Sequence, residues 1–197
     1  MQLDYNKKCT KKFDMEKDKM IQMLITLLKK AIACLFINDK RNIDMQVSEM
    51  NLCARLAHYL ENEIRQYILF DGYYVDTEYN KTFGNMKKRV IYSDGKLHSV
   101  RCDLLIHSRG LLKPDNLLAL EMKKEKVDSN VEDDHDRLQH IIQPRTNETP
   151  IDAVCDTVLG VFLRIEKKGY VLTKYWYDNG IKSVTEKFEF KIKEKNE

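Results

Sequence analysis

The feature that most constrains the fold is a pair of apolar segments in the middle of the chain that contain charged residues. Residues 98–107 (HSVRCDLLIH) contain Asp103, and residues 116–123 (NLLALEMK) contain Glu121 and Lys123. Both segments are apolar enough to be central strands, and the loop SRGLLKPD between them contains turn-forming glycine and proline. A charge in a central strand costs several kcal/mol unless it is paired or bound to metal. We therefore expect a functional site on these strands.

The spacing of these charges indicates which of them share a surface. Every second residue of a strand points to the same face of the sheet. The face that holds Glu121 and Lys123 is expected to include Leu117, and the face that holds Asp103 is expected to include His107. If the strands pair, the three charges converge. A divalent cation relieves the repulsion between two carboxylates, and oxygen ligands suit Mg²⁺ or Mn²⁺. A structural ion pair is the alternative.

The remaining pattern predicts an α/β fold with a mixed central sheet flanked by helices. Helical periodicity covers residues 13–38 and 131–143, and a further helix is expected to begin after Ser48, a favourable N-cap. Strand patterns cover residues 73–79, 157–165, 169–177 and 183–192. We expect residues 1–47 to form an N-terminal helical extension and residues 48–197 to form the α/β domain.

Glu49 follows Ser48 at the edge of the apolar face of its helix. An acid there is either a solvated first-turn residue, favoured by the helix dipole, or a side chain directed into a site. The pattern Glu-x-Lys occurs three times, at residues 121–123, 166–168 and 189–191. Only the first follows an apolar run and an upstream strand that carries an aspartate.

The order helix, strand, Asp strand, Glu-x-Lys strand, helix, strand over residues 48–165 resembles the PD-(D/E)xK nuclease superfamily. Cys102 stands where that motif has proline. The resemblance implies that Asp103, Glu121 and Glu49 hold Mg²⁺ or Mn²⁺ with the backbone carbonyl near Met122. It implies that Lys123 orients the attacking hydroxide or stabilises the developing charge. The implied activity is metal-dependent hydrolysis of phosphodiester bonds, in DNA rather than RNA.

Contacts to nucleic acid are expected to be local, because the net charge is only +3. Lys87, Lys88 and Arg89 form either a phosphate-contacting flap or a solvated loop. Arg101 is a further candidate contact, and His107 either contacts phosphate or packs. Other acids are expected to be solvated. Asp76 and Glu78 on a one-sided strand either face solvent, which is favoured, or extend the acidic site. The run Glu132, Asp133, Asp134 and Asp136 at a helix start suits the helix dipole, with metal binding as the less favoured alternative.

The N-terminal helix and the cysteines suggest a cytoplasmic protein. The apolar stripe of residues 20–36 is interrupted by Gln22, Lys29 and Lys30, so no membrane span is expected. The stripe is a core face or a homodimer face, and core packing is favoured. The five cysteines are widely spaced and are expected to be reduced.

Two functions compete with a nuclease. One is a catalytically inactive nuclease-like domain that binds nucleic acid or a protein partner, since a fold alone does not determine activity. The other is a structural or regulatory module that uses the N-terminal helix as its interaction face.

Overall fold

The computed structural model describes residues 16–81, 89–91, 96–125, 131–150 and 153–190. Its helices are α1 (Lys17–Asn38), α2 (Lys40–Asp44), α3 (Glu49–Ile64), the short 3₁₀ helix η1 (Ile68–Phe70) and α4 (Val131–Ile141). Its strands are β1 (Tyr74–Thr77), β2 (Arg89–Ile91), β3 (Leu97–Ser99), β4 (Leu104–His107), β5 (Asn116–Lys124), β6 (Leu159–Glu166), β7 (Gly169–Tyr177) and β8 (Ile181–Glu189).

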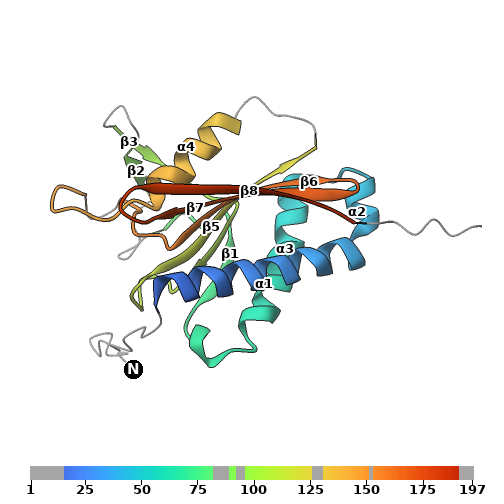
Figure 1. Ribbon diagram of the computed structural model, residues 1–197, viewed down its shortest axis with the longest axis horizontal. Coiled ribbons are helices and arrows are strands. Elements are labelled where there is room, and N and C mark those ends of the chain that lie inside the picture. Colours follow the sequence, from blue (N-terminus) through green and yellow to red (C-terminus); the bar gives the residue numbers. More distant parts are fainter. Residues whose placement is uncertain (1–15, 82–88, 92–95, 126–130, 151–152, 191–197) are drawn as a thin grey trace, which may run out of the picture.

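A six-stranded mixed sheet in the order β1-β4-β5-β6-β7-β8 forms the centre of the molecule, and β2 and β3 form a separate hairpin (Figure 1). Strands β1, β4 and β5 are antiparallel to one another. The chain then crosses through α4, so that β6 runs parallel to β5. Strands β7 and β8 complete the sheet as antiparallel neighbours. The predicted α/β class, with a mixed sheet flanked by helices, is confirmed.

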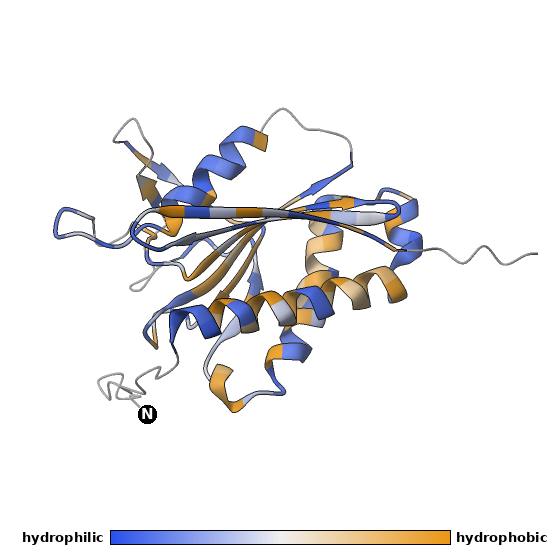
Figure 2. Ribbon diagram, viewed as in Figure 1, coloured by the Kyte–Doolittle hydropathy of each residue, from blue (hydrophilic) through white to orange (hydrophobic). Residues whose placement is uncertain are grey.

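The sheet separates two hydrophobic clusters of unequal size. The larger lies between the sheet and helices α1 and α3, and it includes Leu118, Leu120 and Met122 of β5. The smaller lies under α4 and the β2–β3 hairpin, and it includes Leu105 and Ala119. In Figure 2 the ribbons of α1 and α3 carry many apolar residues, whereas α4 is mostly hydrophilic. Glu121 and Lys123 follow Ala119 by alternation, so they belong to the α4 face of the sheet.

Helix α1 contributes its apolar stripe to the larger cluster, including Leu24, Leu28 and Leu35, which have no exposed surface. By length and composition alone, α1 is long and apolar enough to cross a membrane. Core helices meet the same criterion, and here the stripe packs against α3 and the sheet. The apolar stripe of α1 is therefore a core face, which was the favoured of its two alternatives.

The predicted strand at residues 98–107 is wrong as a single element. It is divided into β3 and β4, and residues 100–103 lie between them. Val100 and Cys102 in this connection are buried in the smaller cluster. The segment of Lys87, Lys88 and Arg89 was expected to be a flap or a solvated loop, but Arg89 begins β2, whose Val90 is buried in the same cluster. Burial under α4 therefore overrides the local polarity of this segment.

A register irregularity also corrects the face assigned to Leu117. The pairing of β4 with β5 shifts between Ile106 and His107, so that His107 pairs with Asn116. Leu117 consequently packs in the larger cluster with Leu118 rather than on the face of Glu121. One extra residue in a strand reverses the alternation beyond it.

Candidate functional site

The candidate site lies where β5 extends past the end of β4. The last paired residues are Leu120 and Leu104, and continuing this register places Asp103 beside Glu121. Asp103 is outside β4, and its Oδ2 accepts a hydrogen bond of 2.8 Å from the backbone N–H of Met122. A carboxylate thus takes the place of a backbone carbonyl at the end of the strand pair. Asp103 and Glu121 therefore lie at the same end of the sheet.

Glu49 reaches this end of β5 from the first turn of α3. Ser48 caps the helix, because its Oγ accepts a 3.2 Å hydrogen bond from the backbone N–H of Asn51. Glu49 Oε1 accepts a hydrogen bond from the N–H of Lys124 at 3.2 Å, and its Oε2 is 3.8 Å from Lys123 Nζ. Glu49 is therefore directed at the site, and the alternative of a solvated first-turn acid is not the one observed.

Helix α4 supplies two residues that were not predicted as site residues, Asp134 and Arg137. Lys123 Nζ is 3.0 Å from Asp134 Oδ2, and Arg137 Nη1 is 2.6 Å from Glu121 Oε1. Arg137 Nη2 also lies 3.3 Å from Asp134 Oδ1. The expectation that Asp134 is solvated is wrong, because only 4% of this residue is exposed.

The spacing of α4 contained the signal for this burial. Asp134, Leu138 and Ile141 are the buried residues of the helix, and they recur at intervals of four and three. Asp134 therefore lies on the same stripe as the two apolar residues and faces the sheet. Arg137 lies one turn after Asp134, within reach of it.

Burial and mutual repulsion perturb the acids. Burial, together with the charges of Asp103 and Asp134, raises the pKa of Glu121 to about 8, although Arg137 opposes this. Burial also raises the pKa of Asp103, and the N–H of Met122 and the charge of Lys123 only partly offset it. The negative charge of the site is therefore incompletely balanced.

Lys123 remains a cation in this environment. Burial alone would lower its pKa, but the hydrogen bond to Asp134 and the charges of Asp134 and Glu49 outweigh burial and raise it. Lys123 is consequently a charged hydrogen-bond donor at neutral pH rather than a general base. Only 14% of its side chain is exposed, so it is fixed between α3 and α4.

The side chains of this site fit a hard divalent cation in chemistry and charge. Glu49, Asp103, Glu121 and Asp134 provide carboxylate oxygens, which Mg²⁺ and Mn²⁺ prefer. Within the described parts of the chain, no three His, Cys, Asp or Glu side chains are already arranged to hold a metal ion. Instead, Arg137 contacts Glu121 and Lys123 contacts Asp134. A divalent ion that used these carboxylate oxygens would have to displace the two basic side chains.

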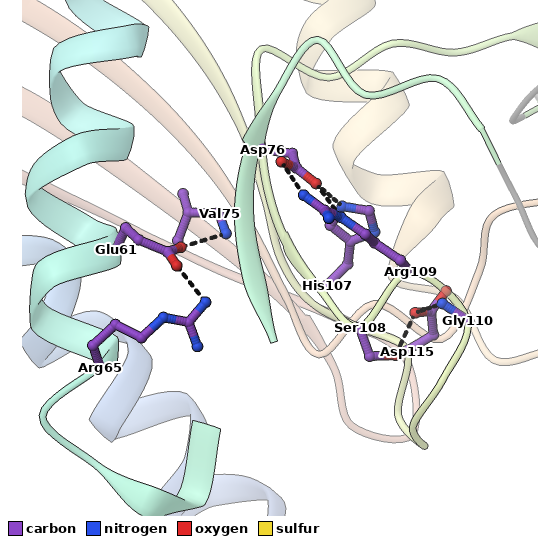
Figure 3. A network of polar contacts seen from close by, with 9 residues as sticks. All are labelled: Glu61, Arg65, Val75, Asp76, His107, Ser108, Arg109, Gly110 and Asp115. Atoms are coloured by element: carbon purple, nitrogen blue, oxygen red, sulfur yellow. Dashed lines mark hydrogen bonds and ion pairs between the residues drawn. The ribbon is translucent and has the colours of Figure 1, made fainter. Parts of the chain in front are cut away.

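His107 is not part of this cluster. It is fully buried, its Nε2 lies 2.9 Å from Asp76 Oδ2, and its ring packs on Tyr79. Arg109 binds the same carboxylate through Nη2 at 2.8 Å (Figure 3). Packing, rather than phosphate contact, is the alternative that this burial supports. The expectation that Asp76 is simply solvated is wrong, because it is half-buried and its carboxylate contacts both His107 and Arg109.

The candidate contacts to nucleic acid are only partly described. Arg101 is exposed, and its Nη2 lies 3.6 Å from Glu78 Oε1. Arg89 is exposed at the start of β2, and its carbonyl accepts a hydrogen bond from the N–H of Val154. Lys87 and Lys88 lie outside the described residues. Their roles in binding nucleic acid stay predictions.

None of the four described cysteines forms a disulfide, and Cys53 and Cys102 are buried. The four carboxylates of Glu49, Asp103, Glu121 and Asp134 together form the acidic cluster, and Cys53 lies close to it. Burial raises the pKa of the Cys53 thiol, and the charges of Asp103 and Glu121 raise it further. Cys9 lies outside the described residues.

Comparisons with protein-family models, with curated proteins and with solved structures gave no match. A functional assignment therefore has to be argued from the geometry and chemistry of this cluster.

Proposed function

We propose that the protein is a nuclease that hydrolyses phosphodiester bonds with Mg²⁺ or Mn²⁺, with DNA as its substrate. The observation that carries the proposal is the convergence of Asp103, Glu121 and Lys123 at the end of β5, joined there by Glu49. Buried carboxylates with raised pKa values beside a fixed lysine are typical of functional sites rather than of ordinary protein interiors.

The arrangement of elements supports the same proposal. The order α3, β1, β4, β5, α4, β6 is helix, three strands, helix, strand, as the PD-(D/E)xK resemblance implies. Strands β1, β4 and β5 are antiparallel, and β6 returns parallel to β5 through α4. The β2–β3 hairpin is an insertion between the first two of these strands.

Each residue has a distinct task under this proposal. Glu49, Asp103 and Glu121 would hold the divalent ion, with the backbone carbonyl of Met122 as a further oxygen ligand. The ion supplies activation of water and neutralisation of charge on the phosphate. Lys123, which the neighbouring acids keep protonated, orients the nucleophile or donates a hydrogen bond to the phosphate oxygen as charge develops.

Binding of nucleic acid without cleavage is the second candidate, and one observation favours it. Glu121 is held by Arg137 at 2.6 Å, so the carboxylate already has a cationic partner. If that ion pair is permanent, the site holds no metal and the domain binds without cutting.

Metal dependence distinguishes the two functions. Supercoiled plasmid, single-stranded DNA and RNA are each incubated with the protein in Mg²⁺, Mn²⁺ or EDTA. We expect cleavage in the metal buffers that EDTA abolishes, and DNA to be cut in preference to RNA. Lys123→Ala should lower the rate by a factor of at least about 100, as expected when an electrostatic stabiliser is removed.

Lys124→Ala is the matched control for this variant. Lys124 is the next residue on β5, but by alternation it lies on the other face, where its Nζ donates to Gln46 O at 3.3 Å. It should retain most of the cleavage. A gel shift in EDTA with intact nucleic acid in every metal buffer would support the binding module and contradict the nuclease.

A further inference from the structure

Arg137 is positioned in the acidic cluster in a way that bears on how a metal enters it. Its guanidinium contacts Glu121 at 2.6 Å and Asp134 at 3.3 Å, and 20% of its side chain is exposed. The side chains of its two partners are only 3% and 5% exposed. The guanidinium therefore lies between two buried carboxylates that belong to different elements, β5 and α4.

Arg137 provides the charge balance that a divalent ion would otherwise provide. Glu121 and Asp134 repel each other, and their mutual repulsion contributes to the raised pKa of Glu121. Arg137 opposes that rise both by its charge and by its hydrogen bond. Lys123 contacts the other oxygen of Asp134, so two basic side chains share this carboxylate.

A guanidinium and a divalent cation cannot both occupy this position. Oε1 of Glu121 contacts Arg137 at 2.6 Å, and a metal ion a few ångströms from a guanidinium is strongly repelled in a buried environment. Metal binding to Glu121 and the Arg137–Glu121 contact therefore oppose each other. Two states linked in this way compete for the same protein, so weakening one strengthens the other.

We propose that Arg137 is a built-in competitor of the metal ion, and that the site is loaded by exchange of its guanidinium for a divalent cation. The inference rests on the proposed function and goes beyond it, because it names the residue that sets how tightly the metal binds. Arg137 is thus a positioning residue: it acts through Glu121, and its guanidinium occupies the carboxylate as long as no metal ion is bound. A guanidinium released in this way is well suited to bidentate pairing with a phosphodiester.

The test is the affinity for Mn²⁺ in the absence of nucleic acid, measured by isothermal titration calorimetry on the full chain. Arg137→Met removes the competing charge, and we expect it to bind Mn²⁺ at least about tenfold more tightly than the wild type. Arg137→Lys, which keeps a charge but loses the fork geometry, should fall between them. Arg137→Gln keeps a hydrogen-bond donor for Glu121 and serves if the Met variant does not fold, as judged by circular dichroism.

Arg55→Met is the matched control. Arg55 is also a helix arginine that holds a nearly buried carboxylate, since its Nε lies 3.0 Å from both oxygens of Asp39. It is not among the groups that contact the acidic cluster. Its loss should leave the affinity for Mn²⁺ unchanged.

The outcomes separate this inference from the function on which it rests. If the wild type and Arg137→Met bind Mn²⁺ equally, and Glu121→Gln abolishes binding, the metal site stands and the competition is refuted. Weaker binding by both Arg137→Met and Arg137→Gln would also refute it, because Arg137 would then support the metal. If no variant binds Mn²⁺ at millimolar concentration, the proposed function fails, and the inference fails with it.

Discussion

Glu121 is the most buried acid of the candidate site. It belongs to a strand that is otherwise apolar, and it is 2% exposed. Its nearest cation, Arg137, does not fully offset the effects of burial and of the neighbouring acids on its pKa. An ionised carboxylate in this position destabilises the metal-free protein. Under the proposed function, a bound cation would offset this cost, as is expected of a site that favours function over stability.

The first prediction concerns the pH dependence of stability without metal. The folded pKa of Glu121, about 8, lies above its ordinary value of 4.5, so ionisation of this group opposes folding. The loss of folding free energy caused by Glu121 is absent below pH 4.5, grows as the pH rises towards 8, and is constant above that. We expect the stability of Glu121→Gln relative to the wild type to increase over this range in EDTA. Urea midpoints at several pH values measure it, and a constant difference would contradict it.

The sequence revealed some site residues and concealed others for a physical reason. Asp103, Glu121 and Lys123 were predictable because a charge contrasts with the apolar residues of a central strand. Asp134 and Arg137 were not, because α4 carries charges on nearly every turn and a buried acid there has no contrasting background. Only the four- and three-residue spacing to Leu138 and Ile141 distinguished Asp134 from its solvated neighbours.

At the scale of elements, the start of α3 fixes the direction of Glu49. The Oγ of Ser48 accepts the N–H of Asn51, which satisfies one of the free donors of the first turn. Glu49 then extends from an ordered helix end to Lys123 and to the N–H of Lys124.

Replacing the cap should therefore affect both stability and the site. We expect Ser48→Ala to lower the free energy of unfolding by about 1 kcal/mol. We also expect it to weaken binding of Mn²⁺, because Glu49 loses its fixed position. Urea denaturation and calorimetry measure the two effects, with Ser183→Ala on the exposed strand β8 as the control. Unchanged metal affinity would show that this cap does not hold Glu49 in a metal-binding position.

Asp76 of β1 links this strand to His107 of β4 and to Arg109, which follows β4 closely in the chain (Figure 3). Burial opposes ionisation of Asp76, but the hydrogen bonds from Arg109 and His107 outweigh burial and hold its pKa below the ordinary value of 3.8. A lowered pKa stabilises the fold above 3.8, and this contribution disappears as the pH falls below that value.

Asp76→Asn should consequently destabilise the protein by about 2 kcal/mol at pH 7, since it leaves a buried histidine and an arginine without their anion. The difference from the wild type should shrink below pH 3.8. Acid and urea titrations followed by circular dichroism measure it. Asp133→Asn, at an exposed position of α4, is the control and should change stability by less than about 0.5 kcal/mol. An equal loss in both variants would refute a specific role of Asp76.

The elements themselves were predictable where one periodicity extends over many residues. Helices α1 and α3 and strands β5 to β8 lie close to their expected positions, because long apolar patterns determine them. The division of residues 98–107 was not predictable, because Val100 and Cys102 look like strand residues and are buried for another reason, under α4. The irregularity at Leu117 likewise depends on the pairing with β4.

At the scale of the molecule, α1 is part of the packing rather than an appendage to it. Its apolar residues join those of α3, β5, β6 and β7 in one cluster. Lys29 of α1 also lies 2.7 Å from Glu186 of β8, so the helix reaches the far edge of the sheet. A stripe covered by its own chain offers little apolar surface to a second copy, which weakens the interpretation of α1 as a dimerisation face.

The last prediction tests that conclusion by adding a charge to two positions of the same helix. Leu28 has no exposed surface, whereas Ile37 is 76% exposed. Leu28→Asp places an unpaired carboxylate in the larger cluster. This costs several kcal/mol, which is a large part of the free energy of unfolding of a domain of this size. We expect it to abolish folding, as measured by circular dichroism, while Ile37→Asp folds and keeps the oligomeric mass of the wild type in light scattering. If Leu28→Asp stayed folded and changed only the oligomeric mass, the stripe would be an interface between copies. The cluster that unites α1 with the sheet would then form only in the assembled protein.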